Sequence, residues 1–203
     1  MDRRELLKMI ALLTGGAMIG GNSLLTGCSP EKRKINTLFS QQDEEFLDLV
    51  ADTMLPDTAK SPGAKAAKVG SFMTVIVDDC YQEKDQKVFV EGIAKLNAAS
   101  EKMHGMAFIK ATAAQRLALI LAMDKEAKDY QASKGSLEEI ERKKDKNFTS
   151  LPSHYFTMMK QLAFFGYFTS EVGATQAMRY VAAPGRFEGS VPYKKGDKSW
   201  AWN

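Results

Sequence analysis

Apolar residues recur along most of this chain at the three- and four-residue spacing of a helix, and no other feature limits the possible folds as strongly. The series Val69, Phe72, Met73, Ile76 and Val77 keeps one helical face apolar for about three turns. No segment alternates apolar and polar residues for long enough to build a sheet. We therefore expect an all-α fold, a single compact domain of about six helices.

Capping and breaking residues place the helix boundaries. Ser40 with Asp43, and Thr112 with Gln115, have the spacing of a capping box. Gly105 suits a helix end because glycine accepts the left-handed conformation there. The expected helices are 41–54, 69–81, 84–103, 112–133, one from about 150 to 165 with Pro152 at its start, and a short one after Thr169 or Ser170, while the charged segment 135–147 is expected at the surface.

The apolar positions of these helices are the expected core, and their methionines are expected to pack rather than to form a ligand surface. The ordered loop 55–68 should join the first two helices, since it contains Pro62 and Gly63. The expected core residues are Phe46, Leu49, Val50, Met54, Met73, Val77, Cys80, Val88, Phe89, Ile93, Leu96, Met103, Leu117, Ile120, Leu121, Tyr155, Phe156, Met159, Leu162 and Phe165.

The composition changes after Tyr180. Five glycines and prolines fall within 13 residues, so a regular helix cannot continue and residues 41–180 should form the helical domain. The tail 181–203 is expected to be extended, yet it carries the aromatic residues Phe187, Tyr193, Trp200 and Trp202. Large apolar side chains on an irregular segment need a surface to cover. The tail therefore either wraps its own domain or lies on a partner protein.

A separate set of signals precedes the helices. The pair Arg3 and Arg4 stands before a mildly apolar, glycine-containing run and resembles the signal of the bacterial twin-arginine exporter. The residues LTG before Cys28 resemble a lipobox, whose cysteine becomes lipidated. We expect a removed signal peptide (1–27), a lipid anchor on Cys28 at the periplasmic side of the envelope, and a polar tether (28–40). The general secretory route is the alternative, and a permanent transmembrane helix fits less well because the run is weakly apolar.

The cysteine content agrees with a lipid anchor. Cys28 and Cys80 are the two cysteines of the sequence, and exported proteins usually use cysteines in pairs. A lipid on Cys28 leaves Cys80 without a partner, and we expect a buried, inert thiol on a helix face. A disulfide between the two is the alternative, and it would require the polar tether to fold back.

Charge and motifs exclude several classes of function. The formal net charge of +3 includes +1 from residues 1–27, and the remaining basic residues form no large cluster, so nucleic acid is not an expected partner. His104 and His154 lack neighbours at metal-ligand spacing, and no cofactor-binding motif occurs. We expect no catalytic, cofactor-binding or metal residue in this chain, and His154 has either a structural or an acid-base role.

The C-terminal third resembles a known family. Residues 166–175, with the sequence GYFTSEVGAT, and the later Tyr180 and 184–189 (PGRFEG) look like the C-terminal signature of the gluconate 2-dehydrogenase subunit 3 family. Residues 54–58 (MLPDT) and 61–64 (SPGA) resemble that family's loop after its first helix. The likeness spans essentially residues 40–203.

The resemblance implies a non-catalytic, all-helical accessory subunit. Such a subunit pairs with a large flavoprotein of the glucose-methanol-choline family that holds FAD and oxidises a sugar, polyol or sugar acid, and a cytochrome c subunit can accept the electrons. The small subunit passes through the twin-arginine translocase with its partner and reaches the membrane by the lipid on Cys28.

Within this interpretation, the C-terminal region makes the contact with the flavoprotein. Glu171 and Arg179 could instead cap or pair within the last helix. The expected contact residues are Tyr167, Phe168, Ser170, Glu171, Arg179, Tyr180, Pro184, Gly185, Phe187, Trp200 and Trp202.

Two other classes of function stay open from the sequence. One is a stand-alone envelope lipoprotein with a scaffold or binding role, and the other is an independent enzyme that uses His154 and Glu171. A neighbouring gene for a large FAD-binding oxidoreductase without a signal peptide would favour the accessory subunit over both.

Overall fold

The computed structural model describes residues 5, 38–183, 185–186 and 188–201, and the fold is all-α, as the sequence predicted. The chain divides into two units, Met1–Ile35 and Asn36–Asn203, and every helix treated below belongs to the second. Its elements are α2 (Gln41–Met54), the 3-10 helix η1 (Ala64–Ala67), α3 (Val69–Cys80), α4 (Glu83–His104), the 3-10 helix η2 (Phe108–Lys110), α5 (Ala113–Lys144), α6 (Tyr155–Thr169) and the π-helical turn η3 (Gly173–Ala177).

The predicted caps are present. Ser40 Oγ accepts the backbone N–H of Asp43, and Asp43 in turn accepts from Ser40 N, which closes the capping box at α2. Thr112 and Gln115 form the same arrangement at α5. Gly105 ends α4 with a φ of 71°, a conformation that glycine adopts without strain.

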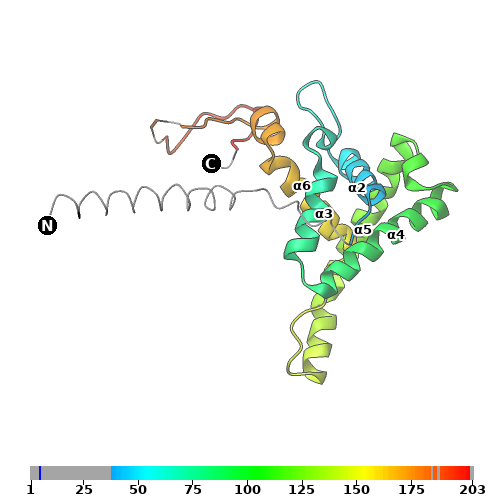
Figure 1. Ribbon diagram of the computed structural model, residues 1–203. Helices are drawn as coiled ribbons and strands as arrows, with labels where there is room; N and C mark the ends of the chain where they lie inside the picture. The colour runs from blue at the N-terminus through cyan, green and yellow to red at the C-terminus, as the bar shows by residue number, and fades with distance from the viewer. Residues whose placement is uncertain (1–4, 6–37, 184, 187, 202–203) are drawn as a thin grey trace. The chain divides into compact units, whose positions relative to one another are not determined.

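Helix α6 is the centre of the domain and contacts α2, α3, α4 and α5 (Figure 1). Tyr155 and Phe156 at its start, and Met159 and Leu162 along its length, are buried. The Tyr155 hydroxyl lies 3.2 Å from Met123 Sδ on α5, and burial raises the pKa of Tyr155 to about 12. Because four helices pack against it, α6 is mostly apolar instead of showing one narrow stripe, although Phe164 and Phe165 remain exposed.

Helices α2 and α3 approach each other closely at Gly70. A Cβ atom on this glycine would lie 2.4 Å from the carbonyl oxygen of Glu44. The Asp48 carboxylate accepts the Gly70 N–H at 2.6 Å and so satisfies a donor in the first turn of α3. Burial raises the pKa of Asp48, and the hydrogen bond from Gly70 partly opposes that rise.

Helix α5 is one continuous helix from Ala113 to Lys144, which corrects the prediction that it ends near Ser133 before a separate surface segment at 135–147. Ser133 Oγ donates to the Tyr130 carbonyl, so this polar side chain is satisfied inside the helix. Gly135 meets no neighbour that would force a break. The helix therefore runs to Lys144, and its last turn carries three basic residues that favour a helix C-terminus.

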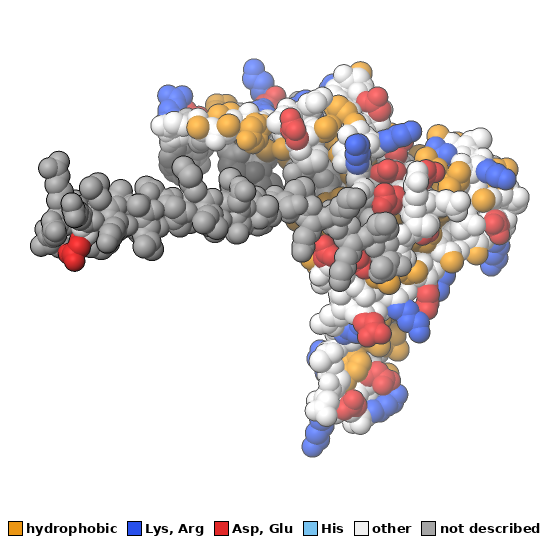
Figure 2. All heavy atoms as spheres, in the orientation of Figure 1, with side chains coloured by type: hydrophobic (Ala, Val, Ile, Leu, Met, Phe, Trp, Pro, Cys, Tyr) orange, Lys and Arg blue, Asp and Glu red, His pale blue; other side chains and the backbone are white. Residues whose placement is uncertain are grey.

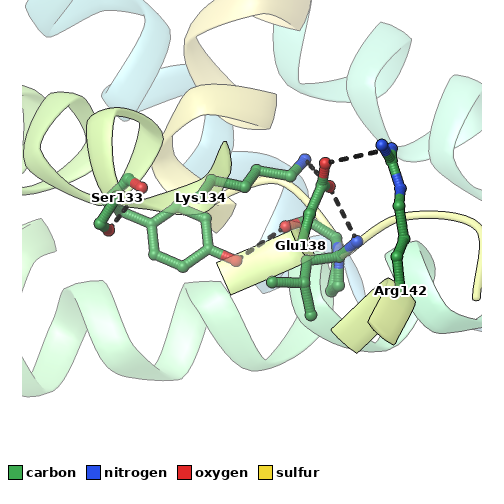
Figure 3. Close-up of polar contacts among 7 residues, drawn as sticks. Ser133, Lys134, Glu138 and Arg142 are labelled. Atoms are coloured by element: carbon green, nitrogen blue, oxygen red, sulfur yellow. Dashed lines mark hydrogen bonds and ion pairs between the residues drawn. The ribbon is translucent and has the colours of Figure 1, made fainter. Parts of the chain in front are cut away.

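The second half of α5 holds the segment that leads back to α6 (Figure 3). Glu138, with a side chain only 17% exposed, accepts the Leu151 N–H at 3.1 Å and lies 3.7 and 3.8 Å from Lys134 and Arg142. The Tyr130 hydroxyl donates to the Pro152 carbonyl at 3.0 Å. The ion pair between Glu138 and Arg142 is thus part of a network that links α5 to the segment before α6.

Helix α6 begins at Tyr155 instead of near Pro152. His154 occupies the N-cap position, where its Nδ1 accepts the Phe156 N–H at 3.2 Å. Its ring also lies near Tyr130 and Tyr155, and its Nε2 is 3.4 Å from Glu126. These contacts give His154 a structural role at the start of the central helix.

Several expected core positions face solvent. Leu117, Leu121, Met103 and Phe165 are 48%, 61%, 48% and 57% exposed, while Leu119 and Met123 fill the core side of α5 instead.

Cys80, expected to be buried, is also exposed. It is the last residue of α3, one turn beyond Val77, so it passes the edge of the core and lines an open cavity of about 460 Å³.

Among the described residues no helix is both long and apolar enough to cross a membrane.

The close approach at Gly70 yields a test of packing. Gly70→Ala should lower the free energy of unfolding by about 1–3 kcal/mol, because the new methyl group meets the rigid backbone of α2. Gly135→Ala is the matched control and should raise it by up to about 1 kcal/mol, since alanine is the better helix former in open space. Urea denaturation measures both, and equal stabilities of the two variants would contradict the packing argument.

Candidate interaction surface

The two sequence segments that carry the family resemblance touch each other. The Tyr167 hydroxyl, on α6, lies 2.7 Å from Ser61 Oγ and donates to the Pro62 carbonyl in the loop after α2. Tyr167 is only 3% exposed, so this expected contact residue is part of the interior. It joins the start of the domain to its C-terminal segment, while the adjacent Phe168 is half-buried beside it.

The expected last helix is a single π-helical turn. Ser170 Oγ donates to the Tyr167 carbonyl at 2.6 Å and accepts the Gly173 N–H at 3.0 Å, which caps the turn. A Cβ on Gly173 would lie 1.9 Å from the Tyr167 carbonyl oxygen, so this tight turn requires glycine. Glu171 is exposed, and the chain leaves the helical geometry before Arg179.

Arg179 closes the base of the C-terminal tail. Its backbone pairs with the strand-like segment that follows residue 198, through Arg179 N to Ser199 O and Ala201 N to Arg179 O, both 2.8 Å. Its guanidinium lies 2.8 Å from Asp197 and 5.6 Å from the centre of the Trp200 ring. The described residues between 180 and 201 therefore form a loop, called here the C-terminal loop, whose neck is the pairing of Arg179 with residues 199–201. Arg179 thus pairs with the tail and not within the last helix.

The C-terminal loop leaves its large side chains uncovered. Tyr180, Tyr193 and Trp200 are 47%, 73% and 49% exposed, and Gly185 is exposed with a φ of 69°. Hydrophobic side chains lie at the surface along this segment, which Figure 1 colours orange to red (Figure 2). The chain folds back through residues 199–201 without burying these aromatic rings, so they are available to another molecule.

Some expected functional residues lie outside the described part of the chain. These are Arg3, Arg4 and Cys28 of the leader, and Pro184, Phe187 and Trp202 of the tail.

A second exposed apolar area was not predicted as a site. Leu117 and Leu121 of α5 and Phe164 and Phe165 of α6 project outward, and we call these four residues the outer apolar face. A groove of about 170 Å³ separates the leucines from Phe164. The sequence signal for this face is the run LAFFGYF at 162–168, which has more apolar positions than one buried helix side can hold.

One charge network borders the groove. Asp124 lies 2.7 Å from Lys128 and 2.5 Å from Lys160. Hydrogen bonds from these two ammonium groups lower the pKa of Asp124, so the carboxylate stays charged well into the acidic range. The same residues line the larger open cavity of about 570 Å³ between α5 and α6.

The histidines have backbone or capping partners. His104 Nε2 lies 3.0 Å from the Gln115 carbonyl, and His154 caps α6. Among the described residues, no group of three or more His, Cys, Asp or Glu side chains has the arrangement of a metal site. The exposed apolar and aromatic side chains of the C-terminal loop and the outer apolar face are suited to binding another macromolecule.

A comparison with family models assigns the chain. The model described as gluconate 2-dehydrogenase subunit 3 matches residues 41–185, from the first residue of α2 to Gly185. The chain belongs to the gluconate 2-dehydrogenase subunit 3 family. Membership makes it an accessory subunit of a dehydrogenase complex, with other dehydrogenase subunits as partners. No curated protein and no solved structure matched the chain.

The family match covers the Tyr167 contact with the loop after α2, the π-helical turn and all four residues of the outer apolar face. It ends at Gly185, before Tyr193 and Trp200. This gluconate 2-dehydrogenase subunit 3 homologue therefore carries one exposed apolar area inside the matched segment and one largely beyond it.

The neck of the C-terminal loop can be tested directly. Arg179→Ala removes the ion pair with Asp197 and the contact with Trp200, so amide hydrogen exchange at residues 179 and 201 should speed up while global stability changes little. Arg186→Ala is the control because it removes a solvent-exposed ion pair with Glu188 within the loop. Equal exchange rates in the two variants would show that Arg179 does not hold the neck.

Proposed function

We propose that this protein is the non-catalytic small subunit of a periplasmic, membrane-associated dehydrogenase that oxidises a sugar, polyol or sugar acid. The large partner is a flavoprotein of the glucose-methanol-choline family, which holds FAD and the active site, and a cytochrome c subunit accepts the electrons. The observation that carries the proposal is the family match over 41–185, joined to the paired arginines and the lipobox cysteine of the leader.

The leader gives this subunit two tasks. Arg3 and Arg4 direct the chain to the twin-arginine translocase, which moves proteins that are already folded. A flavoprotein that lacks a signal can then cross the membrane with its FAD in place, bound to this subunit. The lipid on Cys28 afterwards holds the complex at the envelope, because acyl chains add about 0.8 kcal/mol per buried methylene.

The C-terminal loop supplies part of the grip on the flavoprotein. Its exposed rings, Tyr180, Tyr193 and Trp200, are of the residue types that dominate protein interfaces. The neck at Arg179 limits the conformations of the loop before binding, and a preorganised segment loses less entropy when it docks.

Export and anchoring can be separated by two leader variants expressed together with the flavoprotein. Arg3→Lys with Arg4→Lys should keep both subunits in the cytoplasm, since the lysine pair no longer serves as the export signal. Cys28→Ala should leave export intact and release the complex from the membrane. Fractionation followed by flavin absorbance measures both outcomes. Flavoprotein reaching the periplasm with the lysine pair would contradict the proposed role in export.

Truncation after Tyr180 tests the contribution of the C-terminal loop. The shortened chain lacks Tyr193 and Trp200, so less flavoprotein should co-purify with it than with the full chain. The helical domain should keep its melting temperature within a few degrees, because Ala201 is the only buried core residue among the described positions after 180. Undiminished co-purification would exclude the loop from the interface.

A further inference from the structure

We propose that the outer apolar face, Leu117, Leu121, Phe164 and Phe165, is a second docking site for the dehydrogenase flavoprotein, separate from the C-terminal loop. The inference rests on the proposed function, because it names where the same partner binds. An apolar side chain projecting from the flavoprotein enters the groove between α5 and α6, where Phe164 forms part of the wall, and the contact extends along α6 to Phe165, which packs beside Phe72 of α3.

The first half of α5 is apolar on two sides. Leu119, Ile120 and Met123 point into the core, whereas Leu117 and Leu121, one helical turn apart, are 48% and 61% exposed. Core packing therefore does not account for these two leucines. Residues four apart on a helix lie next to each other on its surface, so the pair forms one continuous apolar ridge.

The exposed phenylalanines of α6 are held in place by other rings. Phe164 lies 6.1 Å from Phe168, measured between ring centres, and Phe165 lies 5.8 Å from Phe72 on α3. Contacts at these distances favour particular ring orientations. Aromatic side chains that are already oriented pay a smaller entropy cost on binding, which suits them to act as interface anchors.

The groove fits a side chain better than a small ligand. Its volume of about 170 Å³ is below the range of about 300–1,000 Å³ that is typical of small-molecule pockets. Met54, Leu117, Ile120 and Phe164 contribute apolar walls. A protruding apolar residue of a protein partner would fill such a groove and remove it from water.

The charges of the groove favour a protein over an anionic membrane. Asp124 and Lys160, the two charged residues that line it, pair with each other at 2.5 Å. A membrane-surface helix typically carries many basic residues around its apolar side to reach lipid headgroups. Here the lining presents a paired ion and apolar walls, which match an uncharged protein surface.

The family match points to the dehydrogenase as the occupant. Its members are dehydrogenase subunits, so a contact that all of them share must lie within the matched residues 41–185. Leu121 and Phe165 are the most exposed of the large apolar side chains described in that segment. Tyr193 and Trp200 of the C-terminal loop lie beyond it. Compared with the C-terminal loop, the outer apolar face is therefore better placed to make a flavoprotein contact that the whole family shares.

Charge substitutions on the full-length chain, expressed together with the flavoprotein, test the site. Leu121→Asp and Phe165→Asp should each lower the co-purified flavoprotein by about tenfold or more, because a carboxylate would be buried without a partner. Ile140→Asp is the control, since Ile140 is 48% exposed on the far half of α5 and should leave recovery unchanged. Circular dichroism of each variant should give the wild-type melting profile, as all three positions are exposed.

The outcomes separate this inference from the function on which it rests. If the wild-type chain recovers flavoprotein and both charge variants recover as much, the docking site is wrong and the accessory role stands. If the wild-type chain recovers no flavoprotein, the accessory role fails and the docking site with it. If Cys28→Ala alone leaves the complex on the membrane, and adding either charge substitution releases it with the flavoprotein still bound, the face contacts lipid and the inference is overturned. If the charge variants keep the flavoprotein but no longer associate with a second copy of this chain, the face is a self-association site and the inference is overturned.

Discussion

The burial of α6 against four other helices is the interaction on which the rest of this fold depends. Phe156, Met159 and Leu162 lie in the core, and each large side chain removed from water contributes about 1.5–3 kcal/mol. The Tyr155 hydroxyl reaches α5, and the Tyr167 hydroxyl reaches the loop after α2. One helix thus fixes the positions of α5 and of the loop after α2.

This central position also explains where apolar surface remains. The core takes up one side of α6 and of α5, but both helices carry further large apolar residues, among them Leu121 and Phe165. An isolated domain gains nothing from exposing them, whereas a subunit of a complex can bury them against its partner. Membership in a family of dehydrogenase subunits is the reason to propose such burial for this exposed surface.

The candidate site was only partly accessible to sequence reasoning. The resemblance pointed to segments that do lie together, because those around Ser61 and Tyr167 meet, and the tail exposes aromatic rings, while its role as a contact surface stays a prediction. It did not distinguish residues that hold this region together, such as Tyr167 and Arg179, from residues that face outward. That distinction depends on which atoms come within hydrogen-bonding distance across sequence separations of 18 (Arg179 to Asp197) to 106 (Tyr167 to Ser61) residues, and spacing along the chain does not record it.

The sequence by itself determined the features that depend on near neighbours: the all-α class, the capped starts at Ser40 and Thr112, and the stop at Gly105. A cap is made by residues within three positions of each other, so the local sequence contains its whole cause. Tertiary structure decided the rest, including the unbroken α5, the start of α6 at Tyr155 and the exposure of Leu121 and Cys80. A helical period shows that an apolar stripe exists, but only the neighbouring helices determine which part of a wide stripe is buried, because burial is a property of packed surfaces and not of one segment.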